Sequence, residues 1–218
     1  MTDIVTPAPK APGRSRRGTM IAIGIALLVV VAIGADTKVV RIGSAADVKA
    51  QVFSPDSFGD KQFPRIQAFV ESHAVDGPTL ATALAADKAG AAKKYGTASS
   101  VGTIMPVKLT AVAGQANGGV YDLTAAGMPP DTHLRIQMGP AINGTELRDA
   151  PGDIAFGDFK NQIEYQNAGS AINRAMKKAI LTPIDTTALT GKTLDIVGVF
   201  RLINPKNWLI TPVAVTVK

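Results

Sequence analysis

The pattern of hydrophobic and polar positions divides the chain into one unbroken apolar stretch and a longer region of mixed polarity. Residues 19–35 contain no charged side chain, and nine of them are Ile, Leu or Val. As a helix this stretch would be about 25 Å long, at the short end for a hydrocarbon core of roughly 30 Å. The pattern therefore predicts a transmembrane helix at the N-terminus.

Arg14, Arg16 and Arg17 precede this stretch, and basic residues favour the cytoplasmic side. We expect residues 1–18 to form a disordered cytoplasmic stub. The rest of the chain would then lie in the periplasm, held by a single pass through the inner membrane. The alternative is a signal peptide that is cleaved near Gly34, which would release the protein into the periplasm.

Residues 36–100 are expected to form a linker, with a short strand up to Ser44, and a small helical subdomain. Ser54 and Pro55 suit a helix start. Pro64 is expected to break or kink this helix and to push Phe63 into extended geometry. A second helix is predicted from the turn at residues 76–78 to Gly96, which suits the position after a helix end.

From Ile104 the hydrophobic period becomes two, which is typical of strands. Runs at 104–111, 120–124 and 133–138 predict a meander, with a hairpin loop of about five residues at Asn117–Gly118. Residues 139–159 look irregular, apart from one helical turn at 145–149.

A helix follows and ends near Leu181, with Asp158 and Asn167 both suitable as its N-cap. Its buried stripe is predicted to contain Ala168, Ile172, Ala175, Met176 and Ala179. Strands at 192–203 and 208–217 close the chain. The alternation places Leu209, Thr211, Val213, Val215 and Val217 on one side of the last strand. This strand should have an edge at Pro212, because proline cannot donate to a ladder.

The order is three strands, one helix and two strands. This order predicts an α+β fold in which residues 101–218 form an OB-like five-stranded β-barrel, with its helix between strands three and four. The helical subdomain and the transmembrane segment would precede it.

Composition narrows the possible chemistry. The chain has no cysteine, which excludes thiolate nucleophiles and thiolate metal sites. Half of the net charge of +6 lies in residues 1–35, so the basic balance is poor support for nucleic-acid binding. The only histidines, His73 and His133, are expected to be structural, and no phosphate-binding motif is present. We expect no metal, no cofactor and no nucleic-acid partner.

One concentration of polar residues brackets the irregular segment. Arg148 could clamp a carboxylate or sugar hydroxyls there, or these side chains could simply satisfy loop backbone groups. Glu146 and Asp149 leave open an exported carbohydrate-active hydrolase that uses acids between Glu146 and Glu164. The candidate ligand- or partner-binding residues are Asn143, Glu146, Arg148, Asp149, Asp158, Asn161, Gln162, Glu164 and Tyr165.

Four runs, at residues 136–150, 156–165, 171–173 and 209–217, resemble predicted periplasmic lipoproteins of domain-of-unknown-function family 2291. Members are similar to proteins found beside bacterial sugar ABC-transporter components. The resemblance implies an accessory role near carbohydrate uptake and brings no catalytic mechanism with it. The family's lipidation cysteine is missing here, which favours the uncleaved anchor. We therefore expect a non-enzymatic, membrane-anchored binding protein, with sugar-transporter components as partners.

Overall fold

The computed structural model describes residues 16–36 and 53–218, which belong to two separate units. In the first unit, α1 (Arg16–Asp36) covers the predicted apolar helix and begins three residues before it. Among the residues that the structure describes, no helix has the length and apolar character needed to cross a membrane. The predicted linker strand before Ser44 and most of the N-terminal stub lie outside the described residues.

The second unit begins with helices. Helix α2 spans Pro55–His73, and Pro64 lies inside it without ending it. The helix is not broken at Pro64 and Phe63 is helical rather than extended, because Phe63, Ile66 and Val70 are buried on one face, while Pro64 is exposed on the other. The carbonyl that Pro64 leaves without a helical partner can therefore face water.

A short strand, β1 (Val75–Asp76), precedes two helices where one was expected, α3 (Gly77–Ala86) and α4 (Lys88–Tyr95). The division falls at Asp87, whose backbone closes α3 and whose carboxylate accepts from the Gly90 amide to start α4. Gly96 ends α4, as the sequence predicts.

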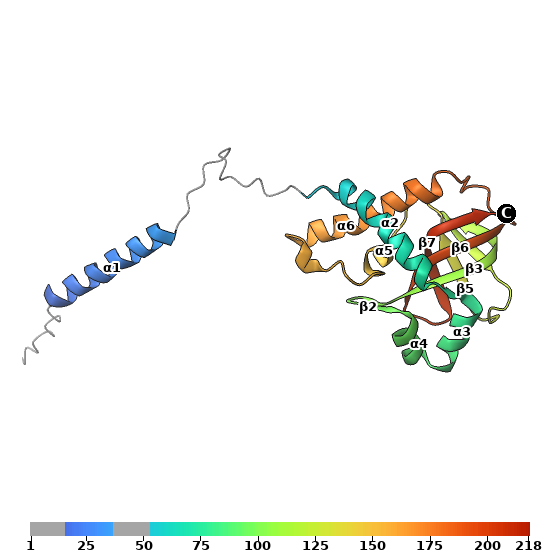
Figure 1. The fold of residues 1–218 in the computed structure, drawn as a ribbon, viewed down its shortest axis with the longest axis horizontal. Coiled ribbons are helices and arrows are strands. Elements are labelled where there is room, and N and C mark those ends of the chain that lie inside the picture. The colour runs from blue at the N-terminus through green and yellow to red at the C-terminus, as the bar shows by residue number, and fades with distance from the viewer. Residues whose placement is uncertain (1–15, 37–52) are drawn as a thin grey trace, which may run out of the picture. The chain divides into compact units, whose positions relative to one another are not determined.

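Five long strands form a closed ring. They are β3 (Gly102–Asn117), β4 (Val120–Thr124), β5 (His133–Gln137), β6 (Thr193–Leu202) and β7 (Asn207–Val217). The pairing order is β3–β4–β5–β7–β6, and β6 pairs with β3 again. Only β5 and β7 run parallel within the ring. β1 and β2 (Thr97–Ser99) pair with β3 outside it. The predicted order of strands and helix is confirmed (Figure 1).

The hairpin between β3 and β4 is tighter than the five-residue loop expected. Only Gly118 and Gly119 lie outside the strands, with φ of +59° and +82°. Gly119 is required for a second reason, since a Cβ there would lie 1.1 Å from the Gly139 carbonyl oxygen. Two residues in the left-handed region match the twist of the paired strands, so the strands continue to the turn.

The segment between β5 and β6 contains α5 (Glu146–Asp149), the 3₁₀ turn η1 (Phe156–Asp158), α6 (Gln162–Met176) and the π-helical turn η2 (Lys177–Leu181). The helical turn at 145–149 and the end at Leu181 are confirmed. Neither Asp158 nor Asn167 caps α6. The cap is Asn161, whose side chain accepts from the Glu164 amide at 2.9 Å. Ala179 is exposed, because the wider π turn rotates it out of the buried stripe.

The last strand differs from strict alternation. A register shift at Val197–Gly198 opposite β7 makes four consecutive residues, 210–213, buried. Trp208 and Ile210 therefore point inward before the shift, and Leu209 points outward, so the residues that the alternation grouped do not share one side. Pro212 lies beyond Ile210, the last residue of β7 that pairs with β5, as an edge position requires.

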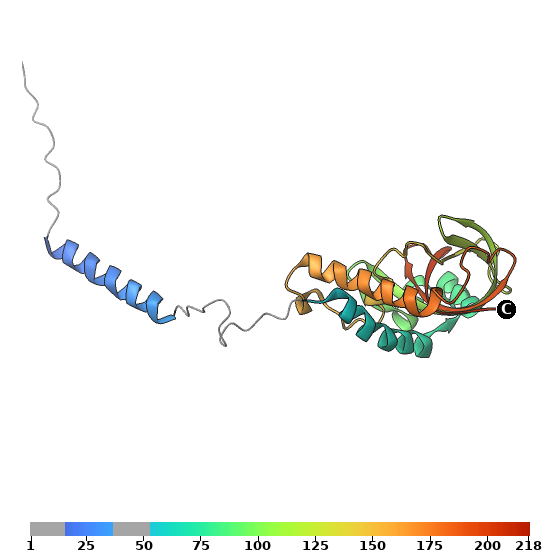
Figure 2. The same ribbon diagram turned by 90° about the horizontal axis from the view of Figure 1, so that it is seen from above.

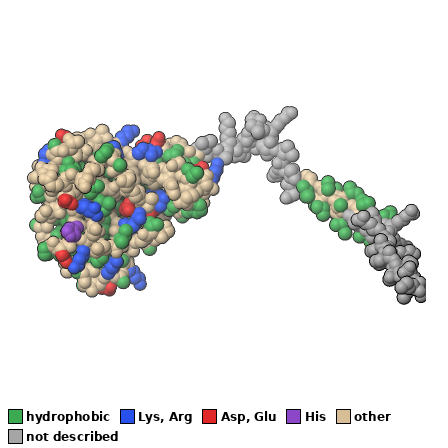
Figure 3. Space-filling model, turned by 180° about the vertical axis from the view of Figure 1, so that it is seen from behind, with side chains coloured by type: hydrophobic (Ala, Val, Ile, Leu, Met, Phe, Trp, Pro, Cys, Tyr) green, Lys and Arg blue, Asp and Glu red, His purple; other side chains and the backbone are tan. Residues whose placement is uncertain are grey.

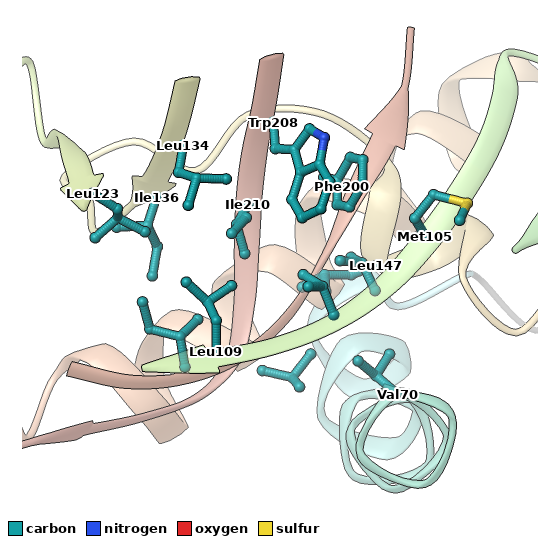
Figure 4. Packing of buried hydrophobic residues seen from close by; sticks show 14 of the residues in the cluster. Val70, Met105, Leu109, Leu123, Leu134, Ile136, Leu147, Phe200, Trp208 and Ile210 are labelled. Atoms are coloured by element: carbon teal, nitrogen blue, oxygen red, sulfur yellow. The ribbon is translucent and has the colours of Figure 1, made fainter. Parts of the chain in front are cut away.

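A mostly aliphatic core fills the ring, with Trp208 stacked on Phe200 at a centroid distance of 4.4 Å (Figure 4). Helices α2 and α6 lie side by side against the strands (Figure 2). Val70 and Leu80, from the predicted helical subdomain, enter the same core as the strands. Residues 53–218 form one compact unit, and the boundary expected at residue 100 falls inside it.

Candidate functional site

Arg148 and Asp149 form a buried ion pair in α5. Arg148 Nε donates to Asp149 Oδ1 at 2.8 Å, and the two side chains are only 5% and 4% exposed. The other carboxylate oxygen of Asp149 accepts from Thr145 Oγ1 at 2.7 Å. Arg148 also donates to the Tyr165 carbonyl at 3.2 Å, and its guanidinium carbon lies 3.6 Å from the centre of the Tyr165 ring. This pair is arranged to hold the loop to α6, and the Arg148 side chain is buried.

Several of the other candidate residues satisfy backbone groups locally. Asp158 accepts from the Ala155 amide at 2.9 Å, and Glu164 accepts from the Lys160 amide at 3.0 Å. Asn161 caps α6, and Gln162 is exposed in the first turn of that helix. These contacts are what loop and helix-start backbone groups need, and they do not converge on a common space.

Glu146 lines a cavity on the outside of the strand ring. It pairs with Arg201, from the end of β6, with 2.9 Å between Oε1 and Nη2. Arg201 Nη2 also donates to Thr145 Oγ1 at 3.2 Å. The ion pair joins α5 to the outer face of the strand ring, where β5, β7 and β6 lie next to one another.

The cavity has a volume of about 360 Å³. Its polar side chains are mostly planar amides and guanidinium groups, and its apolar part comes from the outward-facing Leu209 and from Ile203. Asn143 of the predicted set also lines it. The lining residues are Arg135, Gln137, Asn143, Gly144, Glu146, Arg201, Ile203, Asn204, Asn207 and Leu209.

Most polar groups of this lining already have partners within the protein. Gln137 donates to Thr211 Oγ1 at 2.8 Å and to the Asn143 carbonyl at 3.0 Å, and it accepts from the Asn143 amide. Arg135 donates to Asn207 Oδ1 at 2.9 Å. These bonds fix the side chains in place, so the rim of the cavity is pre-organised.

Two buried atoms of the ion pair have no hydrogen-bond partner within residues 16–36 and 53–218, Glu146 Oε2 and Arg201 Nε. The side chains themselves are 13% and 23% exposed. A buried polar atom without a partner costs about 1–3 kcal/mol, so each such atom requires an explanation, and a functional role is one of them. With Arg135, the cavity holds two positive charges and one negative charge, so it suits a neutral or acidic ligand that is rich in hydroxyl groups.

Sequence reasoning missed Arg135, Gln137, Arg201 and Asn207. The alternation in the last two strands put Arg201 on the outer face, but nothing in the pattern indicated that Glu146 would meet it there. Of the nine predicted residues, the structure brings Asn143 and Glu146 to this cavity. Arg148 and Asp149 form the buried ion pair, and the Tyr165 ring packs against the Arg148 guanidinium.

A second cavity, of about 510 Å³, lies at the β3–β4 hairpin and is lined by Tyr121, Lys177 and Thr186 among others. Lys177 Nζ donates to the Pro140 carbonyl at 2.6 Å, and Tyr121 Oη donates to the Thr186 carbonyl at 2.9 Å. Its polar groups are therefore satisfied internally. Within residues 16–36 and 53–218, no three acidic or histidine side chains are grouped so as to hold a metal ion.

The family profile described as "Predicted periplasmic lipoprotein (DUF2291)" matches residues 25–216. The chain belongs to this family. DUF2291 is a family of predicted periplasmic proteins whose function is not defined, which agrees with the resemblance found in the sequence. A search of curated proteins found no match.

Among solved structures, this DUF2291 member is similar to an OB-fold protein from Thermotoga maritima, with a TM-score of 0.60 and 14% identity. The match covers 77% of this chain and all of that one. At this identity the likeness shows the fold alone. It agrees with the ring of five strands and with the position of α6 between β5 and β6.

Proposed function

We propose that this chain is a non-enzymatic accessory protein of carbohydrate ABC transport, held at the periplasmic side of the inner membrane by its N-terminal segment. We further propose that it binds a small carbohydrate in the cavity formed around Glu146 and Arg201. The observation that carries the proposal is the pair of partnerless atoms, Glu146 Oε2 and Arg201 Nε, in residues that line this cavity.

The chemistry of the lining supports a sugar. A pyranose presents hydroxyl pairs at its edge and C–H groups on its faces. Guanidinium and carboxylate groups bind neighbouring hydroxyls through two parallel hydrogen bonds. Leu209 and Ile203 offer an apolar surface to a sugar face, and 360 Å³ falls in the range of small-ligand sites.

The non-enzymatic part of the proposal rests on the number of carboxylates. Glycoside hydrolysis uses two facing carboxyl groups. Glu146 is the only acidic residue among those that line the cavity, while Asp149 is held by Arg148 and Thr145. The geometry therefore favours binding over the hydrolase alternative.

The test uses the full chain purified in detergent. Neutral mono- and disaccharides and a uronic acid are titrated by calorimetry against the wild type, R201M and R174M. Arg174 forms an exposed pair with Asp56, so R174M is matched to R201M in chemistry and differs in place. We expect R201M to abolish binding and R174M to preserve it. If no sugar binds the wild type, or if R201M binds normally, the cavity is not the site.

A second measurement tests the location. Membranes of the native host are extracted at alkaline pH, and the chain is recovered for N-terminal sequencing and for identification of proteins that accompany it. Retention in the membrane with residues 1–35 intact, together with transporter subunits, is the expected result. A soluble chain that begins near Ala35 would refute the anchor, and the absence of transporter subunits would remove the transport association.

A further inference from the structure

Aromatic side chains gather at one end of the residue 53–218 unit. Phe53 contacts Phe58 and Phe159 with centroid distances of 5.5 and 5.4 Å. Tyr165 contacts Phe159 at 5.4 Å and Phe156 at 5.7 Å. We call this group, with Ile163, the aromatic tip. It contains four of the seven phenylalanines of the chain, so its composition differs from that of the rest of the surface.

The aromatic tip is not fully covered by the fold. Phe156 is 50% exposed and Ile163 is 70% exposed, and the other members are only partly buried. Single exposed apolar residues are normal on a protein surface. Here the exposed Phe156 contacts the ring of Tyr165 within a cluster of four half-buried rings, and contiguous apolar surface marks an interaction site.

The place of the aromatic tip in the chain indicates what covers it. Phe53 is both a member of the tip and the first described residue after α1, from which sixteen residues separate it. A chain of that length spans at most about 55 Å. If the N-terminal segment holds the chain in the membrane, as the proposed function requires, Phe53 of the tip is the first described residue of the domain after that segment along the chain.

From these observations we propose that the aromatic tip contacts the phospholipid interface of the membrane, with Phe156 and Ile163 inserted among the headgroups. Phenylalanine and isoleucine are side chains that partition into this region, and aromatic rings are enriched there. The inference rests on the membrane anchoring in the proposed function and does not depend on the ligand.

The charges of the tip select the lipid. Between residues 153 and 165, three acidic residues (Asp153, Asp158 and Glu164) stand against one basic residue, Lys160. This segment therefore does not attract anionic headgroups. The face of the molecule seen in Figure 3 likewise has basic and acidic side chains interspersed. The contact therefore depends on apolar burial, and it should form on zwitterionic phosphatidylcholine and persist at high salt.

The experiment places a fluorescent reporter at the tip. The full chain carrying F156W is reconstituted into phosphatidylcholine vesicles with brominated acyl chains, which quench a nearby indole. The natural Trp208 is fully buried in the core and gives the same background in every variant. V112W is the control, because Val112 is 43% exposed in β3 and takes no part in the aromatic tip. I163W serves as a second reporter in case F156W misfolds.

We expect quenching of F156W or I163W to exceed that of V112W several-fold, with no change between low and high salt. Equal quenching of the tip and control variants, in chains that float with the vesicles, overturns the inference while the anchor stands. The same holds for a blue-shifted F156W emission without quenching, which would show that protein covers the tip. If the chain does not float with the vesicles, the anchor fails and this inference falls with it.

Discussion

The contact between α2 and α6 gives a prediction in which one substitution has opposite effects in two facing helices. Gly59 of α2 lies directly against the backbone of α6. A Cβ at Gly59 would be 2.4 Å from the Ala171 carbonyl oxygen and 2.6 Å from its carbon. Gly169, in α6 itself, has room for a Cβ, since the nearest atom, Thr145 Cγ2, would be 3.5 Å away.

The expected magnitudes follow from these distances. In a helix interior, Gly→Ala favours folding by up to about 1 kcal/mol when space allows. G169A should therefore be more stable than the wild type by most of this 1 kcal/mol. In G59A the Ala171 backbone cannot rotate away, so the helices must separate by more than about half an ångström, and overpacking of this kind costs roughly 1–3 kcal/mol. The separation also weakens the packing of Phe63 and Ile66 in the core.

The assay is thermal unfolding of the full chain in detergent, followed by circular dichroism. For a unit of this size, 1 kcal/mol corresponds to about 2–4 °C in Tm. We expect G169A to raise Tm by up to about 4 °C, and G59A to lower it by about 2–12 °C. A rise in Tm for both variants would refute the reasoning, because it would mean that α2 and α6 do not approach so closely.

Two further predictions concern charges. R148M should lower the free energy of unfolding by about 3–5 kcal/mol in denaturant titrations, because it leaves the buried Asp149 without its cation. Y165F should leave the free energy of unfolding unchanged, because Arg148 contacts the ring and the carbonyl of Tyr165. Hydrogen bonds from Lys218 and Thr110 hold the pKa of Asp195 below its ordinary value. The ionised Asp195 therefore stabilises the fold at pH values above its unfolded-state pKa, and this stabilisation is lost as pH falls through its folded-state pKa. In thermal melts between pH 6 and pH 2, the Tm of D195N should fall less with decreasing pH than that of the wild type. The same pH dependence of Tm in both would contradict the prediction.

The strands were predictable because each has one buried face. Alternation located β3, β4, β5 and β6 and the order of elements, and from these the OB-like topology. It failed in β7, where the register shift opposite Gly198 exchanges the two faces and turns Leu209 outward. A shift of one residue leaves no mark in the polarity of the sequence, because residues 208–217 are apolar on both sides of it.

The helix boundaries failed for a different reason. Pro64 and Asn161 are local signals for helix ends, but the packing of the helices determines where α2 and α6 begin and end. Proline did not end α2 because the helix buries Phe63, Ile66 and Val70 on either side of it. Asn161 was overlooked because two other capping residues stand within six positions, and only the packing of α6 against α2 selects among them.

The candidate cavity was the least predictable feature, since the two residues of its ion pair, Glu146 and Arg201, are 55 positions apart and meet only when the ring closes. Yet the polar cluster found in the sequence has a definite role. Arg201 contacts Glu146 and Thr145, Thr145 contacts Asp149, Asp149 contacts Arg148, and Arg148 contacts Tyr165 of the aromatic tip. A buried arginine in an ion pair holds its surroundings rigid, because any movement would leave a buried charge without its partner. Arg148 therefore fixes α5, which carries the cavity's carboxylate, to the start of α6, which carries Tyr165 of the aromatic tip, so that the cavity and the tip are held at a set distance from each other.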